Sequence, residues 1–291
     1  MAHSNFNQNR IAIVYDFDGT LSPQPMQEYT VLPKLGVVPG EFWAKVDEEA
    51  KATEAEPMLV YMRHLIELAE KKNIHIGRED FTAMGRNVEY YPGVESWFDR
   101  INTFVDEQAK HQVEIDHYII SAGIREILEG VSIRDHFRRV YASEYYYNHH
   151  NTATFPKLLI TDTTKTQFLF RINKGLEHLS ESINAHMEEE VRAVPFRNIV
   201  YIGDGLTDVP SMAVTRQNGG NAIAVYNKKS DRELNVCQGL LQAQRVNFIA
   251  PADYQAGSIL EKRTQTLLRS IITDIEYQQE LHLCRQENGL T

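Results

Sequence analysis

Short apolar runs alternate along the chain with stretches whose apolar positions recur every three or four residues. Five mainly apolar runs predict strands, at residues 11–15, 115–120, 198–202, 222–226 and 246–250. The first run is apolar at every position, which is typical of a strand buried on both faces of a parallel sheet. Amphipathic stretches at residues 95–109 and 211–215 predict helices between the strands. This alternation predicts an α/β fold with a doubly wound, Rossmann-like parallel sheet.

The long segment between the first two predicted strands has no strand pattern. Its helical stretches lie near residues 27–35, 41–70 and 80–88. Prolines 23 and 25 open this segment and a Pro-Gly pair at residues 92–93 closes it. We therefore expect residues 23–91 to form an inserted helical domain, and residues 1–22 and 92–291 to form the α/β core.

Two other segments have patterns that need an interpretation. Tyrosines and histidines gather at residues 145–150, and we interpret them as a surface hairpin or loop rather than as a metal site or a base-stacking platform. Apolar residues from 260 to 275 form one face of a helix that we expect to pack on the sheet. The mostly polar residues 276–291 are expected to be poorly ordered.

Composition and charge narrow the possible partners. Hydrophobic residues make up 42% and charged residues 24% of the 291 residues, which is ordinary for a soluble globular protein. The chain has 30 Lys+Arg against 40 Asp+Glu, a formal net charge of −10. This balance argues against nucleic acid as a partner, because such binding neutralises phosphates with an excess of Lys and Arg. A small phosphorylated metabolite needs only a local positive site and stays possible.

Neither a targeting signal nor a membrane span is predicted. The first ten residues are polar and lack the apolar stretch of a signal peptide. No apolar run approaches the roughly 20 residues that cross a bilayer. Cys237 and Cys284 are too few for a disulfide framework. We therefore expect a cytoplasmic protein without a membrane partner, and the sequence leaves its oligomeric state open.

Polar, glycine-containing sequences follow three of the predicted strands. Asp16 and Asp18 follow the first strand, Ser121 the second, and Asp204 and Asp208 the third. Ligands of open α/β sheets bind beyond the carboxyl ends of the strands, so these side chains should meet at one edge. Clustered carboxylates suit Mg²⁺, which would screen their charge and let a phosphate approach. A carboxylate can also be a covalent nucleophile, as in aspartyl-phosphate chemistry.

These sequences resemble the motifs of the haloacid dehalogenase superfamily, in particular those of its phosphatases. The matching segments are DFDGT at residues 16–20, Ser121 after an apolar strand, and GDGLTD at residues 203–208. A helical segment between the first two motifs is similar to the cap domain of the phosphoserine-phosphatase-like members. The motifs and their order along the chain carry this resemblance.

The resemblance implies a chemical role for each aspartate. Asp16 is expected to attack phosphorus and form an aspartyl-phosphate. Asp18 is expected to protonate the leaving oxygen and then to activate water. Mg²⁺ is expected to bind Asp16, the carbonyl of Asp18, and Asp204, and Asp208 to bind or orient the ion.

The resemblance also implies a phosphate site. The backbone N–H groups after Asp16, at Phe17, Asp18 and Gly19, are expected to hold phosphate oxygens. Ser121 and the amide of Ala122 are expected to hold another oxygen. A lysine upstream of Asp204 is expected to neutralise the phosphate and the nucleophile.

Two lysines, Lys165 and Lys174, could be this lysine. Apolar residues at positions 168, 172, 176, 179 and 183 predict one helix that begins near Thr164, with Lys165 on its inward face. A cation at a helix N-terminus is unfavourable unless an anion lies near, and this favours Lys165. In the alternative, Gly175 breaks the helix and Lys174 begins a new one.

Structural interpretations of the other motif residues stay open. Asp18 and Gly19 could form only a turn, Ser121 could be a helix N-cap, and Asp208 could only support its loop. In phosphoserine phosphatases an acidic residue of the cap follows the first motif and helps to bind the substrate amine. Here the corresponding position, nine residues after Asp16, is Pro25. The first acid is Glu28, which puts phosphoserine in doubt as the substrate.

Residues of the helical segment have two interpretations. Glu28 and Arg63 could contact substrate, although solvent-facing helix charges are the more common case. Five apolar or aromatic residues could line a substrate pocket, but a place in the apolar interior of the segment is the favoured interpretation. These residues are Met26, Tyr29, Phe42, Trp43 and Tyr61.

The sequence thus predicts a Mg²⁺-dependent phosphatase that hydrolyses a small phosphomonoester through an aspartyl-phosphate. A phosphotransferase or mutase with the same chemistry is one alternative, and a non-catalytic phospholigand-binding protein is another. A dehalogenase is disfavoured because that branch lacks an acid two residues after the nucleophile, where Asp18 stands here. A receiver domain is disfavoured by the inserted helical segment.

Overall fold

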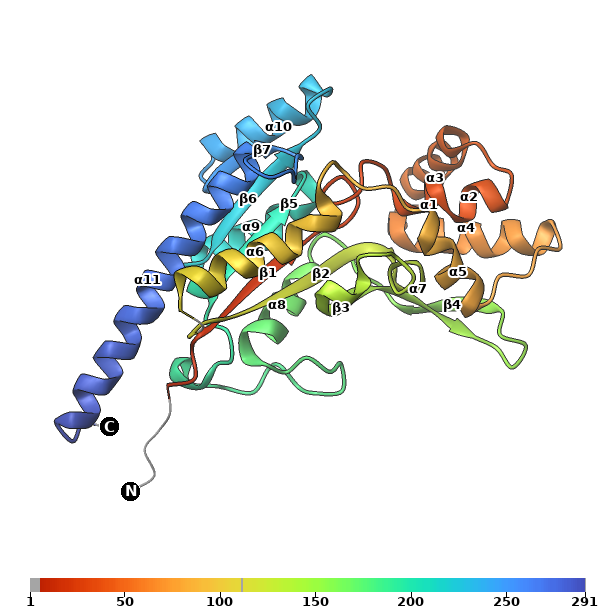
Figure 1. The fold of residues 1–291 in the computed structure, drawn as a ribbon. Helices are drawn as coiled ribbons and strands as arrows, with labels where there is room; N and C mark the ends of the chain where they lie inside the picture. The colour runs from red at the N-terminus through yellow and green to blue at the C-terminus, as the bar shows by residue number, and fades with distance from the viewer. Residues whose placement is uncertain (1–5, 111, 291) are drawn as a thin grey trace.

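The computed structural model describes residues 6–110 and 112–290. Its centre is one seven-stranded sheet with the strand order β4-β3-β2-β1-β5-β6-β7 (Figure 1). All neighbouring strands are parallel except β3 and β4, which form an antiparallel hairpin. The strands are β1 (Arg10–Tyr15), β2 (Glu114–Ile124), β3 (Phe137–Tyr147), β4 (Ala153–Leu158), β5 (Ile199–Gly203), β6 (Asn221–Tyr226) and β7 (Phe248–Pro251).

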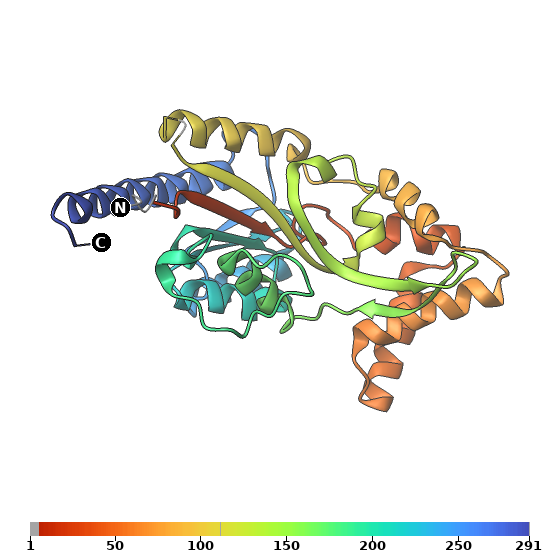
Figure 2. The same cartoon turned by 90° about the horizontal axis from the view of Figure 1, so that it is seen from below.

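Helices cover both faces of the sheet (Figure 2). Helices α6 and α11 pack on one face, and α8, α9 and α10 pack on the other. The helices are α1 (Met26–Tyr29), α2 (Val31–Lys34), α3 (Pro39–Thr53), α4 (Pro57–Lys71), α5 (Arg78–Met84), α6 (Val94–Gln108), α7 (Arg125–Leu128), α8 (Lys165–Lys174), α9 (Val209–Gln217), α10 (Asp231–Gln242) and α11 (Ile259–Glu287). Together with the parallel strands, these layers confirm the predicted doubly wound α/β fold.

Strand β1 shows why its sequence is apolar at every position. Side chains of a strand alternate between the two faces of the sheet. Ile11, Ile13 and Tyr15 belong to the apolar cluster under α6 and α11. Ala12 and Val14 belong to the separate cluster under α8, α9 and α10. A central strand between two helical layers therefore needs apolar residues on both faces.

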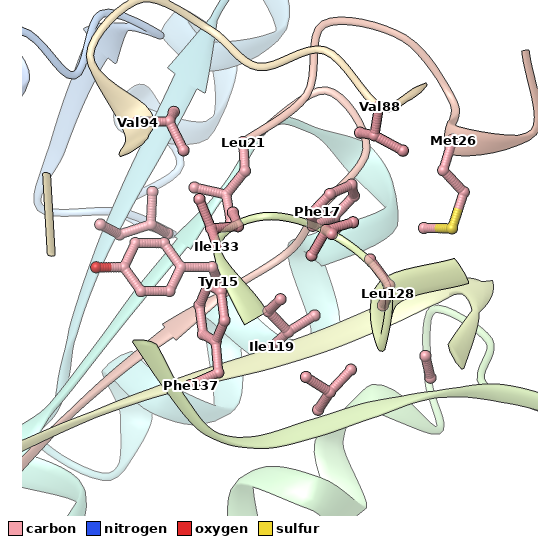
Figure 3. Close-up of a cluster of buried hydrophobic side chains, with 14 of the residues drawn as sticks. Tyr15, Phe17, Leu21, Met26, Val88, Val94, Ile119, Leu128, Ile133 and Phe137 are labelled. Atoms are coloured by element: carbon pink, nitrogen blue, oxygen red, sulfur yellow. The ribbon is translucent and has the colours of Figure 1, made fainter. Parts of the chain in front are cut away.

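Helices α1–α5 lie between β1 and β2 in the chain and gather beside one end of the sheet (Figure 1). We call residues 23–91 the helical insertion. Its apolar interior is continuous with that of the sheet, as Leu21, Met26 and Val88 lie in one cluster with Tyr15 (Figure 3). The β3–β4 hairpin extends to the insertion, where the Tyr145 hydroxyl donates to the Met62 carbonyl at 2.9 Å. The insertion is thus packed firmly on the α/β part.

The predicted helix at residues 41–70 is two helices in the structure. Helix α3 ends at Thr53, Glu54 has a left-handed backbone with φ 54°, and α4 begins at Pro57. A proline lacks the N–H that an uninterrupted helix would need there, but it suits the first turn of a new helix. Strands β3 and β4 were not among the predicted strands. The hairpin predicted at residues 145–150 is confirmed by their connection, but its first residue, Tyr145, is buried and does not lie on the surface.

The prediction of one helix from Thr164 to Ile183 is wrong beyond its first half. Helix α8 ends at Lys174, and Gly175 has a left-handed backbone with φ 70°. Glycine adopts this conformation without the steric penalty of a Cβ atom, so it ends the helix. Leu179, one of the predicted apolar stripe, is 47% exposed. The alternative is confirmed in its first part, because Gly175 ends the helix, and wrong in its second, because no helix begins at Lys174.

Helix α11 is longer than the sequence suggests. Its apolar face packs on the sheet as predicted, from Leu260 to Ile275. The expectation of poor order beyond residue 276 is wrong as far as Glu287, because the helix continues to that residue. Thr291 lies outside the described residues, as do residues 1–5 of the predicted core. None of the helices described here is long and apolar enough to cross a membrane.

Candidate active site

Three carboxylates meet where β1 and β5 end. Asp16 follows β1, Asp204 follows β5, and Asp208 ends the short 3-10 turn Leu206–Asp208. One oxygen of each carboxylate lies within 4.8 Å of the others. All three come from the carboxyl ends of neighbouring parallel strands, where ligands of such sheets bind.

Lys165 joins this cluster from the start of α8. Its Nζ lies 3.0 Å from Oδ1 of Asp16 and 2.8 Å from Oδ1 of Asp208, and the side chain is only 1% exposed. Burial by itself lowers the pKa of an ammonium group, but the carboxylates of Asp16 and Asp208 outweigh burial and raise the pKa of Lys165. The lysine is therefore a fixed positive charge beside Asp16.

Lys174, the other candidate, lies at the opposite end of α8. Its Nζ donates to the carbonyl oxygens of Ile183 and Ala185 at 2.6 and 2.7 Å. Those bonds hold the irregular segment that follows the helix. The structure therefore brings Lys165 into the carboxylate cluster and leaves Lys174 outside it.

Asp208 is fully buried and accepts hydrogen bonds from three directions. Besides Lys165, the Tyr201 hydroxyl donates to its Oδ1 at 2.7 Å, and the backbone N–H of Asp204 donates to its Oδ2 at 3.1 Å. Asp208 thus supports the Asp204 loop and also contributes charge to the cluster. Tyr201 was missed by sequence reasoning, because a tyrosine within an apolar strand carries no signal that its hydroxyl reaches a carboxylate.

Asp16 and Asp18 have different partners although only two residues separate them. Oδ1 of Asp18 accepts the backbone N–H of Met26 at 2.8 Å, whereas Asp16 is paired with Lys165. Burial, with a further contribution from Asp16, raises the pKa of Asp18 to about 8. Burial also raises the pKa of Asp16, to about 7, although Lys165 opposes this shift. Asp16 is therefore the aspartate paired with a cation, whereas Asp18 is held by a backbone N–H.

Gly19 lets the first motif approach Asp204 closely. Its φ is 78°, in the left-handed region, and a Cβ atom on this residue would lie 2.2 Å from Oδ2 of Asp204. Any side chain here would displace the Asp204 carboxylate as well as strain the backbone. Asp18 and Gly19 thus lie in a turn that also shapes the cluster.

The predicted phosphate-binding residues border the same edge. Ser121 is buried within β2 and is not a helix N-cap, because α7 begins only at Arg125 with Ile124 as its N-cap. The backbone N–H of Gly123 donates to its Oγ at 3.0 Å. Phe17 directs its side chain into the apolar cluster (Figure 3), so only its backbone can serve the site.

The cluster has more negative than positive charge. Lys165 is the one cation that forms ion pairs with these aspartates within the part of the chain that the structure describes. Burial, followed by the charges of Asp208 and Asp16, raises the pKa of Asp204 well above its usual range. A largely buried set of carboxylate oxygens with too few cations fits a divalent metal ion of the hard, oxygen-preferring kind. Asp16, Asp204 and Asp208 are the residues that could hold it.

The two charged candidates of the insertion differ. Arg63 forms ion pairs with Glu49 and Glu67 on the surface, so its guanidinium group is already paired within the insertion. Glu28 is half-buried, accepts the indole N–H of Trp43 at 2.9 Å and adds to the raised pKa of Asp18, after burial and Asp16. The Glu28 carboxylate is therefore near enough to Asp18 to influence its ionisation.

The apolar and aromatic residues that could line a pocket in the insertion divide into two groups by burial. Met26, Phe42 and Tyr61 are buried in the apolar interior, as predicted. Tyr29 and Trp43 are only partly buried. Tyr61 also reaches the second motif, where its hydroxyl donates to the Ala122 carbonyl at 3.2 Å.

Comparison with known proteins identifies the family. The chain matches the model of the haloacid dehalogenase-like hydrolases over residues 13–213, so it belongs to this family of hydrolases. An uncharacterised protein of Borreliella burgdorferi is 26% identical over 282 residues, which span 88% of this chain and 95% of that protein.

Solved structures share the fold. A HAD family hydrolase from Salmonella enterica serovar Typhi superposes with a TM-score of 0.56 at 16% identity, over 85% of this chain and 69% of that one. Phosphoserine phosphatase in a phospho-aspartyl intermediate analogue superposes with a TM-score of 0.53 at 14% identity, over 89% of this chain and 99% of that one.

Proposed function

We propose that this hydrolase is a Mg²⁺-dependent phosphatase that acts on a small phosphomonoester. One observation carries the proposal: two aspartates two residues apart have different partners, a buried lysine for Asp16 and a backbone N–H for Asp18. Asp16 is paired with a buried lysine, and Asp18 has a pKa raised by burial to about 8. A nucleophile needs to be ionised and a general acid needs to be protonated, so this division of roles suits acyl-phosphate chemistry.

The first step transfers the phosphoryl group to Asp16. A carboxylate oxygen of Asp16 attacks phosphorus, the bond to the leaving oxygen breaks, and Asp18 gives that oxygen its proton. Lys165 stabilises the negative charge beside the reacting phosphate. The product is an aspartyl-phosphate on Asp16 and a free alcohol.

The second step hydrolyses this intermediate. Asp18, now a carboxylate, takes a proton from water, and the water oxygen attacks phosphorus. The Asp16–phosphorus bond breaks, and Asp16 leaves as a carboxylate. Asp18 is protonated again, so both aspartates return to their starting states.

The residues that would hold Mg²⁺ are Asp16 and Asp204, with the carbonyl of Asp18, and Asp208 would bind or orient the ion. When bound, the ion supplies the positive charge that the cluster lacks and screens the carboxylates from the incoming phosphate. The backbone N–H groups of residues 17–19, Ser121 and the amide of Ala122 would hold phosphate oxygens.

The helical insertion would be the cap of the active site, with residues 6–22 and 92–290 as the α/β core. The contact of Asp18 with the Met26 amide supports this assignment, because the insertion thereby orients the proposed general acid. Cys237 and Cys284 are free thiols, which fits the reducing environment of the cytoplasm.

A turnover screen tests the proposal. Purified protein with Mg²⁺ is assayed for phosphate release from a panel of phosphorylated metabolites and from p-nitrophenyl phosphate. We expect release from some of these esters, loss of release in a chelator, and loss of release in Asp16→Asn. Equal amounts of alcohol and phosphate would distinguish hydrolysis from transfer to a second substrate. No Mg²⁺-dependent release from any ester would contradict the proposed function.

A further inference from the structure

The carbonyl of Ala122 lies where strand β2 departs from its neighbour. Strands β2 and β3 pair in parallel up to Ile120, and the register then shifts before Ile124 pairs with Ser143. A backbone carbonyl at such an irregularity lacks a regular ladder partner and needs another donor when it is buried. Two hydroxyl groups supply it: Oγ of Ser143 at 3.2 Å and the Tyr61 hydroxyl at 3.2 Å.

These two donors come from different parts of the molecule. Ser143 is a fully buried residue of β3. Tyr61 belongs to α4 in the helical insertion, and this tyrosine is only 1% exposed. Oγ of Ser143 accepts the backbone N–H of Ile160 at 3.0 Å, so its own hydrogen is directed to Ala122. Burial, with a contribution from Asp18, raises the pKa of Tyr61, so its hydroxyl remains a donor.

The Ala122 carbonyl and the Gly123 N–H belong to one peptide group. Because a peptide group is planar, donors that hold the carbonyl also fix the direction of the N–H. That N–H donates to Oγ of Ser121 at 3.0 Å. The Ser121 oxygen is therefore occupied as an acceptor, and no protein acceptor for its hydrogen is found among the described residues. The hydroxyl hydrogen of Ser121 is left to donate to a ligand.

We propose that Tyr61 and Ser143 are positioning residues that fix the Ala122–Gly123 peptide and thereby present the Ser121 hydroxyl hydrogen to a phosphate oxygen. This inference rests on the proposed function, because it assigns Ser121 to the phosphate. Tyr61 makes phosphate binding sensitive to where the insertion sits, since its hydroxyl crosses from α4 to β2.

The main test variant is Tyr61→Phe, which removes one hydroxyl and leaves the ring packing. Ser143→Ala is a second variant, although it also deprives the Ile160 N–H of its acceptor. Tyr141→Phe is the matched control: the Tyr141 hydroxyl is also buried and donates to a backbone carbonyl, that of Glu177, at the same distance of 3.2 Å, and neither residue belongs to the helical insertion. The melting temperature of each variant is measured by thermal denaturation, so that a general loss of stability can be told apart from a loss of phosphate binding.

Phosphate binding is measured by calorimetric titration of inorganic phosphate in Mg²⁺, together with KM and kcat for an ester that the wild type hydrolyses. We expect Tyr61→Phe and Ser143→Ala to weaken phosphate binding and to lower kcat/KM by roughly 3- to 10-fold, the effect of one hydrogen bond. We expect Tyr141→Phe to bind phosphate as the wild type does. Binding that is unchanged in both test variants, or weakened equally in the control, would overturn the inference.

A double-mutant cycle with Ser121→Ala separates positioning from general stability. If Tyr61 acts through Ser121, the loss of phosphate affinity caused by Tyr61→Phe should shrink to less than about 2-fold in the Ser121→Ala background. An undiminished loss in that background would show that Tyr61 does not act through Ser121. A wild type that neither binds nor releases phosphate would instead overturn the proposed function itself, and the inference with it.

Discussion

At the residue scale, the central feature is the contrast between Asp16 and Asp18. Both could be assigned from the sequence, because two aspartates directly after an apolar strand stand at the ligand-binding edge of a parallel sheet. Their different partners could not be assigned. Lys165 is 149 positions from Asp16 along the chain, and the Met26 amide becomes a partner of Asp18 only through the turn that Gly19 allows.

The general-acid role of Asp18 is tested by Asp18→Asn. The amide keeps the shape of the side chain but cannot donate the proton, so kcat/KM for an alkyl phosphate should fall by about 10²- to 10⁴-fold. The fall should be much smaller for p-nitrophenyl phosphate in a single-turnover assay, since its leaving group needs little protonation. Equal losses for the two esters would contradict the role of Asp18 as the acid.

A buried histidine outside the carboxylate cluster makes the stability of the fold depend on pH. Nδ1 of His117 lies 3.1 Å from the Tyr15 hydroxyl, and Nε2 lies 2.8 Å from Oδ1 of Asn102. The Trp97 indole N–H donates to the same Tyr15 hydroxyl at 2.9 Å, which leaves the Tyr15 hydrogen to bond Nδ1. His117 is thus neutral with its hydrogen on Nε2, and burial lowers its pKa to about 3.

This histidine should destabilise the fold as the pH falls below 6.5. Above that pH the imidazole is neutral in both states. Between pH 6.5 and about 3 the unfolded chain binds a proton that the folded protein does not, so unfolding is favoured. Between pH 7 and 5 the His117 contribution should reduce the free energy of unfolding by about 2 kcal/mol. Urea denaturation of wild type and His117→Gln at both pH values checks this, and equal pH dependence of the two would contradict it.

At the scale of elements, strands and helices with simple periodicity were predictable and those set by tertiary contacts were not. Strand β1 could be predicted because its apolar run is unbroken. Strands β3 and β4 contain charged and exposed residues, because they form the hairpin that reaches the insertion instead of the centre of the sheet. The start of α8 could be predicted from its apolar spacing, but its end depends on the left-handed conformation of Gly175.

The start of α8 carries a prediction about its two lysines. Lys165→Ala removes the buried cation from Asp16 and Asp208, and kcat/KM should fall by about 10²-fold or more. Lys174→Ala removes only bonds to the Ile183 and Ala185 carbonyls, so kcat/KM should change by less than about 3-fold while the melting temperature falls. Steady-state kinetics on folded variants decide the matter, and a larger loss in Lys174→Ala would reject Lys165 as the phosphate-site lysine.

At the scale of the whole molecule, the chain is negatively charged, and carboxylates also lie near the candidate active site. The chain carries a formal net charge of −10. Burial raises the pKa of Tyr29, and the carboxylates of Glu89 and Glu28 add to this shift. Burial likewise raises the pKa of Tyr91, with Glu233 and Asp204 adding to it. Carboxylates therefore lie near both tyrosines, and Asp18 and Asp204 of the candidate site are among them.

This field should select against substrates with an additional negative charge. A phosphomonoester whose leaving group carries a carboxylate should have a kcat/KM about 10-fold or more below that of a neutral or cationic analogue of similar size. Glu28→Gln should reduce this difference. The control is Glu67→Gln, which removes a carboxylate of the same insertion that is paired with Arg63 on the surface. A preference that is unaffected by Glu28→Gln would assign the selectivity to other groups.

The covalent intermediate on Asp16 is the central claim, and chemical trapping tests it most directly. Borohydride reduces an aspartyl-phosphate to homoserine, which peptide mass spectrometry assigns to a position. Asp18→Asn mixed with Mg²⁺ and p-nitrophenyl phosphate should accumulate the intermediate, because the activated leaving group departs without an acid while water is no longer activated. We predict homoserine at position 16 only when substrate is present. Homoserine at another carboxylate, or none in an enzyme whose wild type releases phosphate, would contradict the mechanism.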